Sequence, residues 1–260
     1  MAQKIQIIFF DVDGTLIDFG KGTASPRTVE ALIRLRKNGV RLCVCTGRSP
    51  MKVPVFPGVE FDAFLTYNGS YCYDRAGAIF RSPLEQKAVA AILRNAAGLR
   101  RPLALATADR LVCNGADDDL REYFSFANSE LAVAADFDEV ARRQEIYQIM
   151  VGFREAEREA LMRGAEGAKI AAWWDRAVDI VPASGGKGVG VRKILEHYHL
   201  GPEDALAFGD GNNDLEMLQA VGHGVAMANG SPELRAMADE VCGSAAEDGI
   251  YHYCVEKRLI

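Results

Sequence analysis

The chain has 260 residues, of which 49% are hydrophobic, and its formal net charge at pH 7 is −6. This length suffices for one large domain or two modest ones, each with its own hydrophobic core. An acidic chain without a basic cluster has no electrostatic basis for binding nucleic acid or an anionic membrane surface. No apolar run approaches the roughly 18 residues of a membrane-spanning helix, so no membrane partner is expected either.

Two further features indicate the compartment. The N-terminal apolar segment is too short for a secretory signal and continues directly into a predicted strand. The six cysteines include no C-x-x-C pair and lie mostly among apolar residues, which is typical of reduced, buried thiols in a cytosolic protein. We therefore expect a cytoplasmic protein.

The first predicted strand, "IQIIFF" (5–10), ends at two aspartates in "FFDVDGTLID" (9–18). Residues i and i+2 of an extended segment point the same way, so Asp11 and Asp13 can face one site while Val12 points into the core. Two adjacent carboxylates repel each other unless a cation lies between them, and Mg²⁺ prefers such oxygen ligands. Gly14 permits a tight turn whose N–H groups can bind an anion. A purely structural role for these aspartates in the turn is the alternative.

A helix is predicted after this loop, with Ser25 as N-cap, Pro26 at its first position and Gly39 at its C-terminal end. Two more strands follow, "VRLCVCTG" (40–47) and "AFLTYNGS" (63–70), and each ends in small polar residues. The strand at 40–47 leads into "TGR", which offers a hydroxyl, a backbone that can come close to a ligand, and a guanidinium. Each of these groups suits a phosphate oxygen. These residues are Thr46, Gly47 and Arg48.

The middle of the chain, residues 83–182, has a different pattern. Short predicted strands ("PLALAT", "RLVCNG", "YQIMVGF", "AKIAAWW") alternate with helical, charged segments, and none of these strands ends in an acidic or glycine-rich turn like those on either side. Trp173 and Trp174 are adjacent on the last of these strands, so at most one of them could line a cleft. We interpret 83–182 as an inserted α+β domain, flanked by 1–82 and 183–260.

The C-terminal part begins with Lys187, in the glycine-rich stretch "ASGGKGVGVRKIL" before a helix expected at about 188–199. This stretch is not a nucleotide-binding P-loop, because Val181 and Gly188 occupy positions where that motif needs Gly and Ser or Thr. Then "AFGDGNNDLEML" crowds Asp210, Asn213 and Asp214 between a strand and a helix. Asp214 can cap that helix, whereas Asp210 at the strand end has no such structural role.

A strand "HGVAMANG" (223–230) and a helix "SPELRAMADEV" (231–241) complete the pattern. Alternating β and α units of this kind predict an α/β fold with a doubly wound, mostly parallel sheet. Ligands of such sheets bind beyond the carboxyl ends of the strands. The loops "DVDGT", "CTGR" and "FGDGNND" are therefore expected to converge on one site.

Taken together, "DVDGTLID", Thr46, Lys187 and "GDGNND" resemble the four motifs of the haloacid dehalogenase-like (HAD) superfamily, in the same order. The resemblance covers 1–82 and 183–260. Too few residues separate the first two motifs to hold a cap domain, whereas the segment between the second and third has room for one. This arrangement is similar to the Cof-type subfamily (IIB), which implies a Rossmann-like HAD core carrying an α/β cap.

The resemblance implies a Mg²⁺-dependent phosphatase that hydrolyses small phosphate monoesters through an aspartyl-phosphate. Asp11 would be the nucleophile, and Asp13 the general acid and base. The metal would be bound by Asp11, by the backbone carbonyl of Asp13 and by Asp210, with Asp214 as a ligand or the anchor of one. The phosphoryl oxygens would be bound by Thr46, Gly47, Lys187 and Asn213, and Arg48 and Asn68 are candidate substrate contacts.

Sugar phosphates are the expected substrates, ahead of vitamin-type phosphates such as pyridoxal phosphate or flavin mononucleotide, with the leaving-group pocket supplied by the cap. Two alternatives remain open. A sugar phosphomutase could share the core, the cap and the aspartyl-phosphate. A non-catalytic sugar-phosphate-binding protein could share the fold, although the complete motif set argues against it. We expect a monomer or a weak homodimer.

Overall fold

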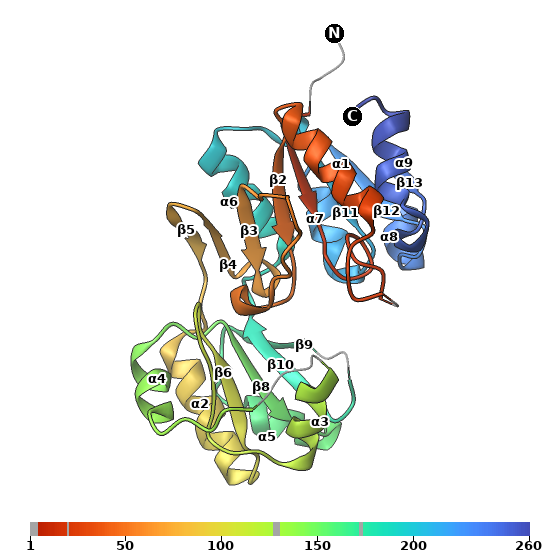
Figure 1. Cartoon of the computed structure of the whole chain (residues 1–260). Coiled ribbons are helices and arrows are strands. Elements are labelled where there is room, and N and C mark those ends of the chain that lie inside the picture. Colours follow the sequence, from red (N-terminus) through yellow and green to blue (C-terminus); the bar gives the residue numbers. More distant parts are fainter. Residues whose placement is uncertain (1–4, 20, 127–130, 172–173) are drawn as a thin grey trace. The chain divides into compact units, whose positions relative to one another are not determined.

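The computed structural model describes residues 5–19, 21–126, 131–171 and 174–260 (Figure 1). The chain divides into two compact units. The first, here the core unit, comprises Met1–Arg48, Lys52–Arg81 and Gly186–Ile260. The second, here the inserted unit, comprises Ser49–Met51 and Ser82–Gly185.

The core unit is built on an eight-stranded sheet, counted over the described residues, with the order β13-β12-β11-β1-β2-β3-β4-β5. Six neighbouring strands are parallel, and β4 and β5 extend this sheet as an antiparallel edge. The doubly wound α/β fold predicted from the sequence is thus confirmed. The strands are β1 (Ile7–Phe10), β2 (Arg41–Cys45), β3 (Ala63–Thr66), β4 (Tyr71–Asp74), β5 (Gly77–Arg81), β11 (Ala205–Gly209), β12 (His223–Met227) and β13 (Glu240–Cys242).

Alternate residues of β1 supply two hydrophobic cores, one on each face of the sheet. Ile8 and Phe10 belong to the cluster under α1 (Pro26–Lys37) and α9 (Gly249–Glu256). Ile7 and Phe9 belong to the cluster under α6 (Lys187–Tyr198), α7 (Leu215–Gln219) and α8 (Pro232–Met237). All four side chains are fully buried, as expected for a central parallel strand covered on both faces.

Helix α1 begins as its sequence predicts. The Ser25 side chain accepts a hydrogen bond from the Thr28 backbone N–H at 3.0 Å, and Pro26 occupies the first turn. Past the last turn, Gly39 adopts a positive φ of 83°, the left-handed conformation that commonly follows a helix.

The predicted helix over 231–241 is wrong in its second half. Helix α8 ends at Met237, and Glu240–Cys242 forms the edge strand β13 instead. Asp239 explains the change, because its backbone N–H donates to the Gly224 carbonyl at 2.9 Å and its side chain accepts from the Gly224 N–H at 2.7 Å. These two bonds align the chain beside β12 and begin a new strand.

The inserted unit contains a five-stranded antiparallel sheet, counted over the described residues, with the order β7-β6-β8-β10-β9. Four of these strands are the predicted ones, whereas β10 was not predicted. They are β6 (Leu103–Ala106), β7 (Leu111–Cys113), β8 (Gln148–Gly152), β9 (Ala168–Ala171) and β10 (Ala177–Pro182). Trp174 lies beyond the end of β9, not on it, and Trp173 lies outside the described residues.

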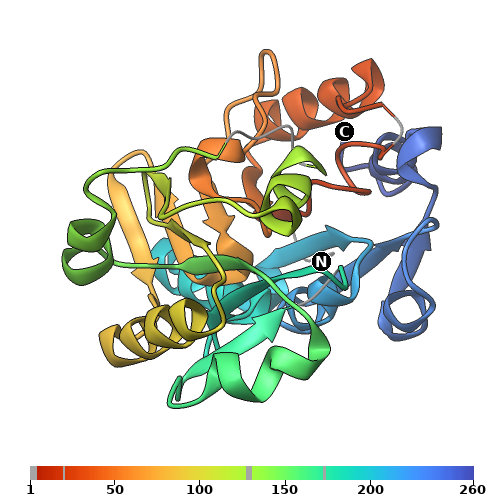
Figure 2. The same ribbon diagram turned by 90° about the horizontal axis from the view of Figure 1, so that it is seen from below.

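Helices cover the two faces of this inserted sheet unequally. Apolar residues of α2 (Gln86–Gly98), α4 (Phe137–Arg143) and α5 (Arg158–Met162) share one core with Val178 and Ile180 of β10. On the opposite face, Tyr123 of α3 (Asp118–Phe126) donates a hydrogen bond to Asp179 at 2.6 Å. Figure 2 shows α2, in yellow, and α3, in lime, on opposite sides of the sheet.

All six cysteines are buried free thiols, as predicted. Among the helices within the described residues, none is both long and apolar enough to cross a membrane.

Candidate active site

The site is assembled at the carboxyl edge of the core sheet, where β11, β1 and β2 lie side by side. Phe10 of β1 is level with Phe208 of β11 and Val44 of β2, so these strands end together. Asp11, Asp210 and Thr46 follow the three strand ends, and a backbone bond from Asp11 N–H to the Phe208 carbonyl (3.0 Å) continues the alignment. The parallel register therefore brings loops distant in sequence together.

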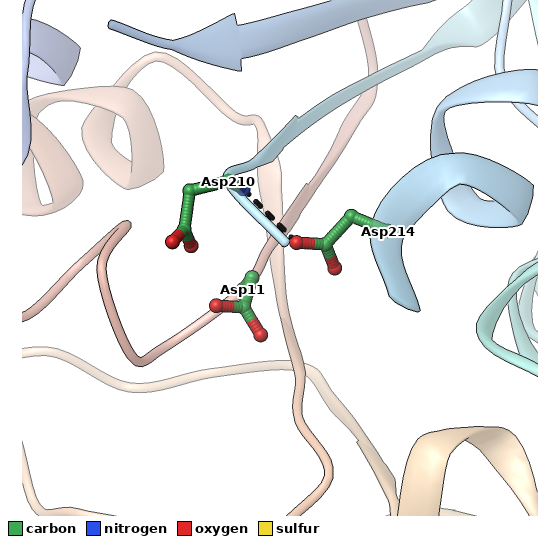
Figure 3. A group of neighbouring side chains, drawn as sticks. All are labelled: Asp11, Asp210 and Asp214. Carbon is green, nitrogen blue, oxygen red and sulfur yellow. Dashed lines mark hydrogen bonds between the residues drawn. The ribbon is translucent and has the colours of Figure 1, made fainter. Parts of the chain in front are cut away.

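Three carboxylates form a compact buried cluster at this edge (Figure 3). One oxygen each from Asp11, Asp210 and Asp214 lies within 4.8 Å of the others. Asp214 is completely buried, and Asp11 and Asp210 are 6% and 8% exposed. Such a set of converging oxygen atoms is suited to a hard divalent cation.

Specific hydrogen bonds hold the carboxylates in place. One oxygen of Asp214 accepts the backbone N–H groups of Asp210 and Gly211, both at 3.0 Å, and the first of these bonds is drawn in Figure 3. Asp210 in turn accepts the hydroxyl of Thr15 at 2.8 Å. Asp214 thus stabilises the loop 210–214 through these bonds and also belongs to the carboxylate cluster. A structural role and a role in the site are therefore compatible.

Lys187 lies within this cluster and is only 1% exposed. Its ammonium donates to Asp11 at 2.6 Å and to Asp214 at 2.5 Å. It is therefore not the solvated surface lysine that a glycine-rich loop would ordinarily carry. Gly186 and Gly188 permit this burial, because a Cβ at either would lie 2.1 and 2.5 Å from atoms of Glu216.

The electrostatics of the cluster favour a further cation. Burial raises the pKa of Asp11 well above its usual value; Lys187 counteracts this rise, while Asp214 and Asp210 add to it. Burial also raises the pKa of Asp210 to about 6, although the Thr15 hydrogen bond opposes the shift. Burial alone would lower the pKa of Lys187, but the Asp11 and Asp214 carboxylates outweigh it and raise that pKa. Three carboxylates facing one ammonium leave a negative excess that a divalent metal would neutralise.

Asp13 points to a different partner. Its carboxylate forms a two-pronged ion pair with Arg48, at 2.6 Å to Nη2 and 2.8 Å to Nε. Both side chains are a little over one-third exposed. Of the four predicted metal-binding residues, Asp13 alone has its side chain outside the carboxylate cluster.

The remaining predicted residues also lie in the core unit. Thr46 is buried, and its hydroxyl accepts the Arg48 backbone N–H at 3.1 Å. Gly47 adjoins the carboxamide of Asn68, since a Cβ on Gly47 would lie 3.1 Å from the Asn68 Nδ2. Asn213 donates from Nδ2 to Asn68 Oδ1 at 3.1 Å.

Two residues of the site were not singled out from the sequence. Thr15 bonds to Asp210, and its hydroxyl directly after "DVDG" was the available signal. Asn229 donates to the Gly14 carbonyl at 2.8 Å and accepts the Ala245 N–H at 3.0 Å, so it supports the first loop from the end of β12. Gly14 itself has φ +88°, and a Cβ there would lie 2.2 Å from Asp210.

Comparisons with known proteins agree with this fold. A family profile described as haloacid dehalogenase-like hydrolase matches residues 8–254. The chain is 30% identical over 257 residues to YkrA of Bacillus subtilis (strain 168), which carries a provisional phosphatase name, and the alignment covers 98% of both chains. It is 26% identical to the 5-amino-6-(5-phospho-D-ribitylamino)uracil phosphatase YitU of the same organism, again over 98% of each.

Solved structures point the same way. A protein from Geobacillus kaustophilus HTA426 superposes with a TM-score of 0.91 at 31% identity, over 98% of this chain and 99% of that one. The HAD subclass IIB sugar phosphatase BT4131 superposes with a TM-score of 0.82 at 26% identity, over 98% and 100%. The chain belongs to the haloacid dehalogenase-like hydrolases, in the Cof-type branch, and is a phosphoric monoester hydrolase.

Proposed function

We propose that the chain is a Mg²⁺-dependent phosphatase acting on small phosphate monoesters, sugar phosphates foremost, through an aspartyl-phosphate on Asp11. The observation that carries the proposal is the buried cluster of Asp11, Asp210 and Asp214 around Lys187. A buried cluster with this charge excess is costly for folding alone, but it suits a divalent metal and a phosphate dianion. The family profile and the phosphatase relatives support the same reaction.

In this proposal Asp11 attacks phosphorus with one carboxylate oxygen. The phosphorus–oxygen bond to the alcohol breaks, and the leaving oxygen takes a proton from the Asp13 carboxyl. The Asp13 carboxylate then accepts a proton from the water that attacks the aspartyl-phosphate. Inorganic phosphate leaves, and the Asp11 carboxylate and the Asp13 acid are restored.

The metal would be held by Asp11 and Asp210 together with the Asp13 backbone carbonyl, with Asp214 as a direct ligand or the anchor of one. When bound, it supplies positive charge between the carboxylate nucleophile and the anionic ester. Lys187 adds a second positive charge and holds Asp11 with its oxygen in a fixed direction.

Other groups of the core unit would bind the phosphoryl oxygens as their charge develops. The hydroxyl of Thr46, the backbone of Gly47 and the carboxamide of Asn213 are the candidates, alongside Lys187. Stabilising this distributed charge is the larger part of catalysis in phosphoryl transfer. We further propose that residues 1–82 and 183–260 are the catalytic domain and that 83–182 form a cap that provides the leaving-group pocket.

A panel of phosphate esters tests the proposal. Purified protein, stripped with EDTA and reloaded with Mg²⁺, is assayed for phosphate release from sugar phosphates, pyridoxal phosphate and flavin mononucleotide. We expect hydrolysis that EDTA abolishes and Mg²⁺ restores, with the highest kcat/KM for a sugar phosphate. Activity indifferent to EDTA would refute the metal assignment, and isomerisation of a sugar phosphate with a bisphosphate activator would refute hydrolysis in favour of a mutase.

A further inference from the structure

The segment after β3 contains an unusual run of backbone conformations. Tyr67, Asn68 and Gly69 all have positive φ, at 50°, 51° and 92°. Glycine adopts this region freely and asparagine tolerates it, but a residue such as tyrosine is strained there. Tyr67 is nonetheless buried at 1% exposure. The surrounding structure therefore enforces this turn.

Contacts with the neighbouring loops account for the enforcement. The backbone N–H groups of Tyr67 and Asn68 donate to the carbonyls of Arg48 and Thr46, at 3.0 and 3.1 Å. Gly69 lies against the loop that precedes Lys187, because a Cβ there would be 2.2 Å from the Gly186 carbonyl oxygen. The turn thus joins two loops that carry proposed phosphoryl-binding groups.

The Asn68 side chain extends this junction to a third loop. Its carboxamide lies against Gly47, and its Oδ1 accepts the Asn213 Nδ2 at 3.1 Å. This is the one hydrogen bond that the structure shows for the Asn213 Nδ2 among the described residues. Because Nδ2 carries two hydrogens, a second donor remains on Asn213 after the bond to Asn68 is made.

We infer that Asn68 is a positioning residue, whose side-chain oxygen fixes the carboxamide of Asn213 so that the remaining N–H is directed at a phosphoryl oxygen beside Gly47. The inference rests on the proposed function, because it assigns Asn213 to the phosphoryl group. Asn213 is exposed, so without Asn68 its side chain would sample several rotamers and bind phosphate less well. The left-handed backbone at residue 68 aims the side chain across Gly47 toward Asn213.

A double-mutant cycle separates positioning from direct contact. Asn68→Gly removes the side chain and suits the left-handed backbone, and Asn213→Ala removes the positioned amide. The affinity of the Mg²⁺-loaded protein for inorganic phosphate is measured by calorimetry for the wild type, each single variant and the double variant, together with kcat and KM for the best ester. Loss of one hydrogen-bonding arrangement predicts a roughly threefold to tenfold weaker phosphate affinity for Asn68→Gly.

Positioning predicts that the double variant is no worse than Asn213→Ala alone, because Asn68 acts only through Asn213. Losses that multiply would show that Asn68 contacts the phosphoryl group independently, and an unchanged Asn68→Gly protein would show that it does neither; both results overturn the inference. His199→Gly is the matched control, since His199 also has a left-handed backbone (φ 56°) but caps α6. It should leave phosphate affinity and kinetics unchanged.

A measurement on the unaltered chain covers the case in which Asn68→Gly does not fold. The two Nδ2 protons of Asn213 should exchange with water at different rates in NMR spectra, with the proton bonded to Asn68 slower. Equal, rapid exchange would overturn the inference. The phosphate-binding arm needs no turnover, so absence of ester hydrolysis would refute the proposed function alone. A wild type that binds no phosphate would refute both.

Discussion

At the scale of single residues, the site divides into a buried and an exposed set of charges. Lys187 and its carboxylate partners are removed from water, so their interactions are strong and their geometry is fixed. Asp13 and Arg48 are partly exposed, so their ion pair contributes little to stability. We therefore expect Arg48 to act mainly by orienting Asp13, the proposed acid and base.

This view predicts the effect of changing Arg48. Arg48→Met should lower kcat by about tenfold to a hundredfold, because an Asp13 carboxylate without its guanidinium partner is less well oriented to accept the proton of the attacking water. Arg48→Lys should recover only part of the loss, since an ammonium cannot form the two-pronged pair. Steady-state kinetics on the best ester measure both, and the melting temperature should fall only slightly.

Arg34→Met is the matched control for Arg48→Met. Arg34 is similarly exposed and pairs with Glu30 along α1 at 3.4 Å, but it belongs to no part of the site. Its kinetics should equal those of the wild type. An Arg48→Met enzyme with unchanged kcat would show that Asp13 needs no such guide.

Site residues could be predicted from the sequence where a motif places them within a few positions of one another. Asp11, Asp210 and Asp214 were singled out because carboxylates follow apolar strands, and the structure does place them together. The bonds from Arg48 to Asp13 and from Asn213 to Asn68 could not be read in this way. They depend on rotamers and on loops that meet only after folding.

At the scale of elements, α3 is held against the inserted sheet by ion pairs of Asp119 with Arg101 and Arg154 and by a hydrogen bond of Tyr123. The Tyr123 hydroxyl donates to Asp179 of β10 at 2.6 Å, on a partly buried face. Burial raises the pKa of Asp179 to about 6, although hydrogen bonds from Tyr123 and Gln148 oppose the rise. Since the folded-state pKa exceeds the unfolded one, the stability that Asp179 contributes is present at low pH and is lost as pH rises through about 6.

Asp179→Asn should therefore stabilise the inserted unit at pH 8, by less than about 3 kcal/mol, and have little effect at pH 3.5, below the unfolded-state pKa. The asparagine oxygen can still accept from Tyr123. Urea unfolding followed by tryptophan fluorescence measures this, because both tryptophans of the sequence fall within the inserted unit.

Asp118→Asn is the control for Asp179→Asn. Asp118 belongs to α3, the helix that carries Tyr123, but its side chain is fully exposed, so no gain confined to pH 8 is expected. Equal changes at both pH values for Asp179→Asn, or a loss of stability at pH 8, would contradict the burial argument.

Helices and strands could be predicted where the pattern of apolar residues agrees with residues that mark the ends of an element, as for β1 and α1. The sequence signals failed for β4, β5 and β13, at or next to the edges of the core sheet, and for β10, which lies inside the inserted sheet. The hairpin of β4 and β5 and the strand β13 have mixed polarity, because an edge strand is not buried on both faces. Strand β13 is fixed by the bonds of Asp239 to Gly224, which no local pattern of the sequence reveals.

At the scale of the whole molecule, one sheet edge explains why residues from opposite ends of the sequence act together. The order β11-β1-β2 places a C-terminal strand beside two N-terminal ones, so Asp210 and Asp11 become neighbours. The alternating β and α pattern was sufficient to predict this, because crossover connections of parallel sheets follow few topologies. No comparable rule predicts from the sequence which substrate the inserted unit would select, because its loops contain no sequence motif of known function.

The proposed mechanism requires that Asp11 becomes phosphorylated during turnover. The most direct test quenches the Mg²⁺-loaded enzyme with acid during hydrolysis of its best ester, reduces acyl-phosphates with borohydride, and maps the peptides by mass spectrometry. We expect conversion of Asp11, and no other aspartate, to homoserine, only when both ester and Mg²⁺ are present. Conversion at Asp13 or Asp210 in place of Asp11 would contradict it.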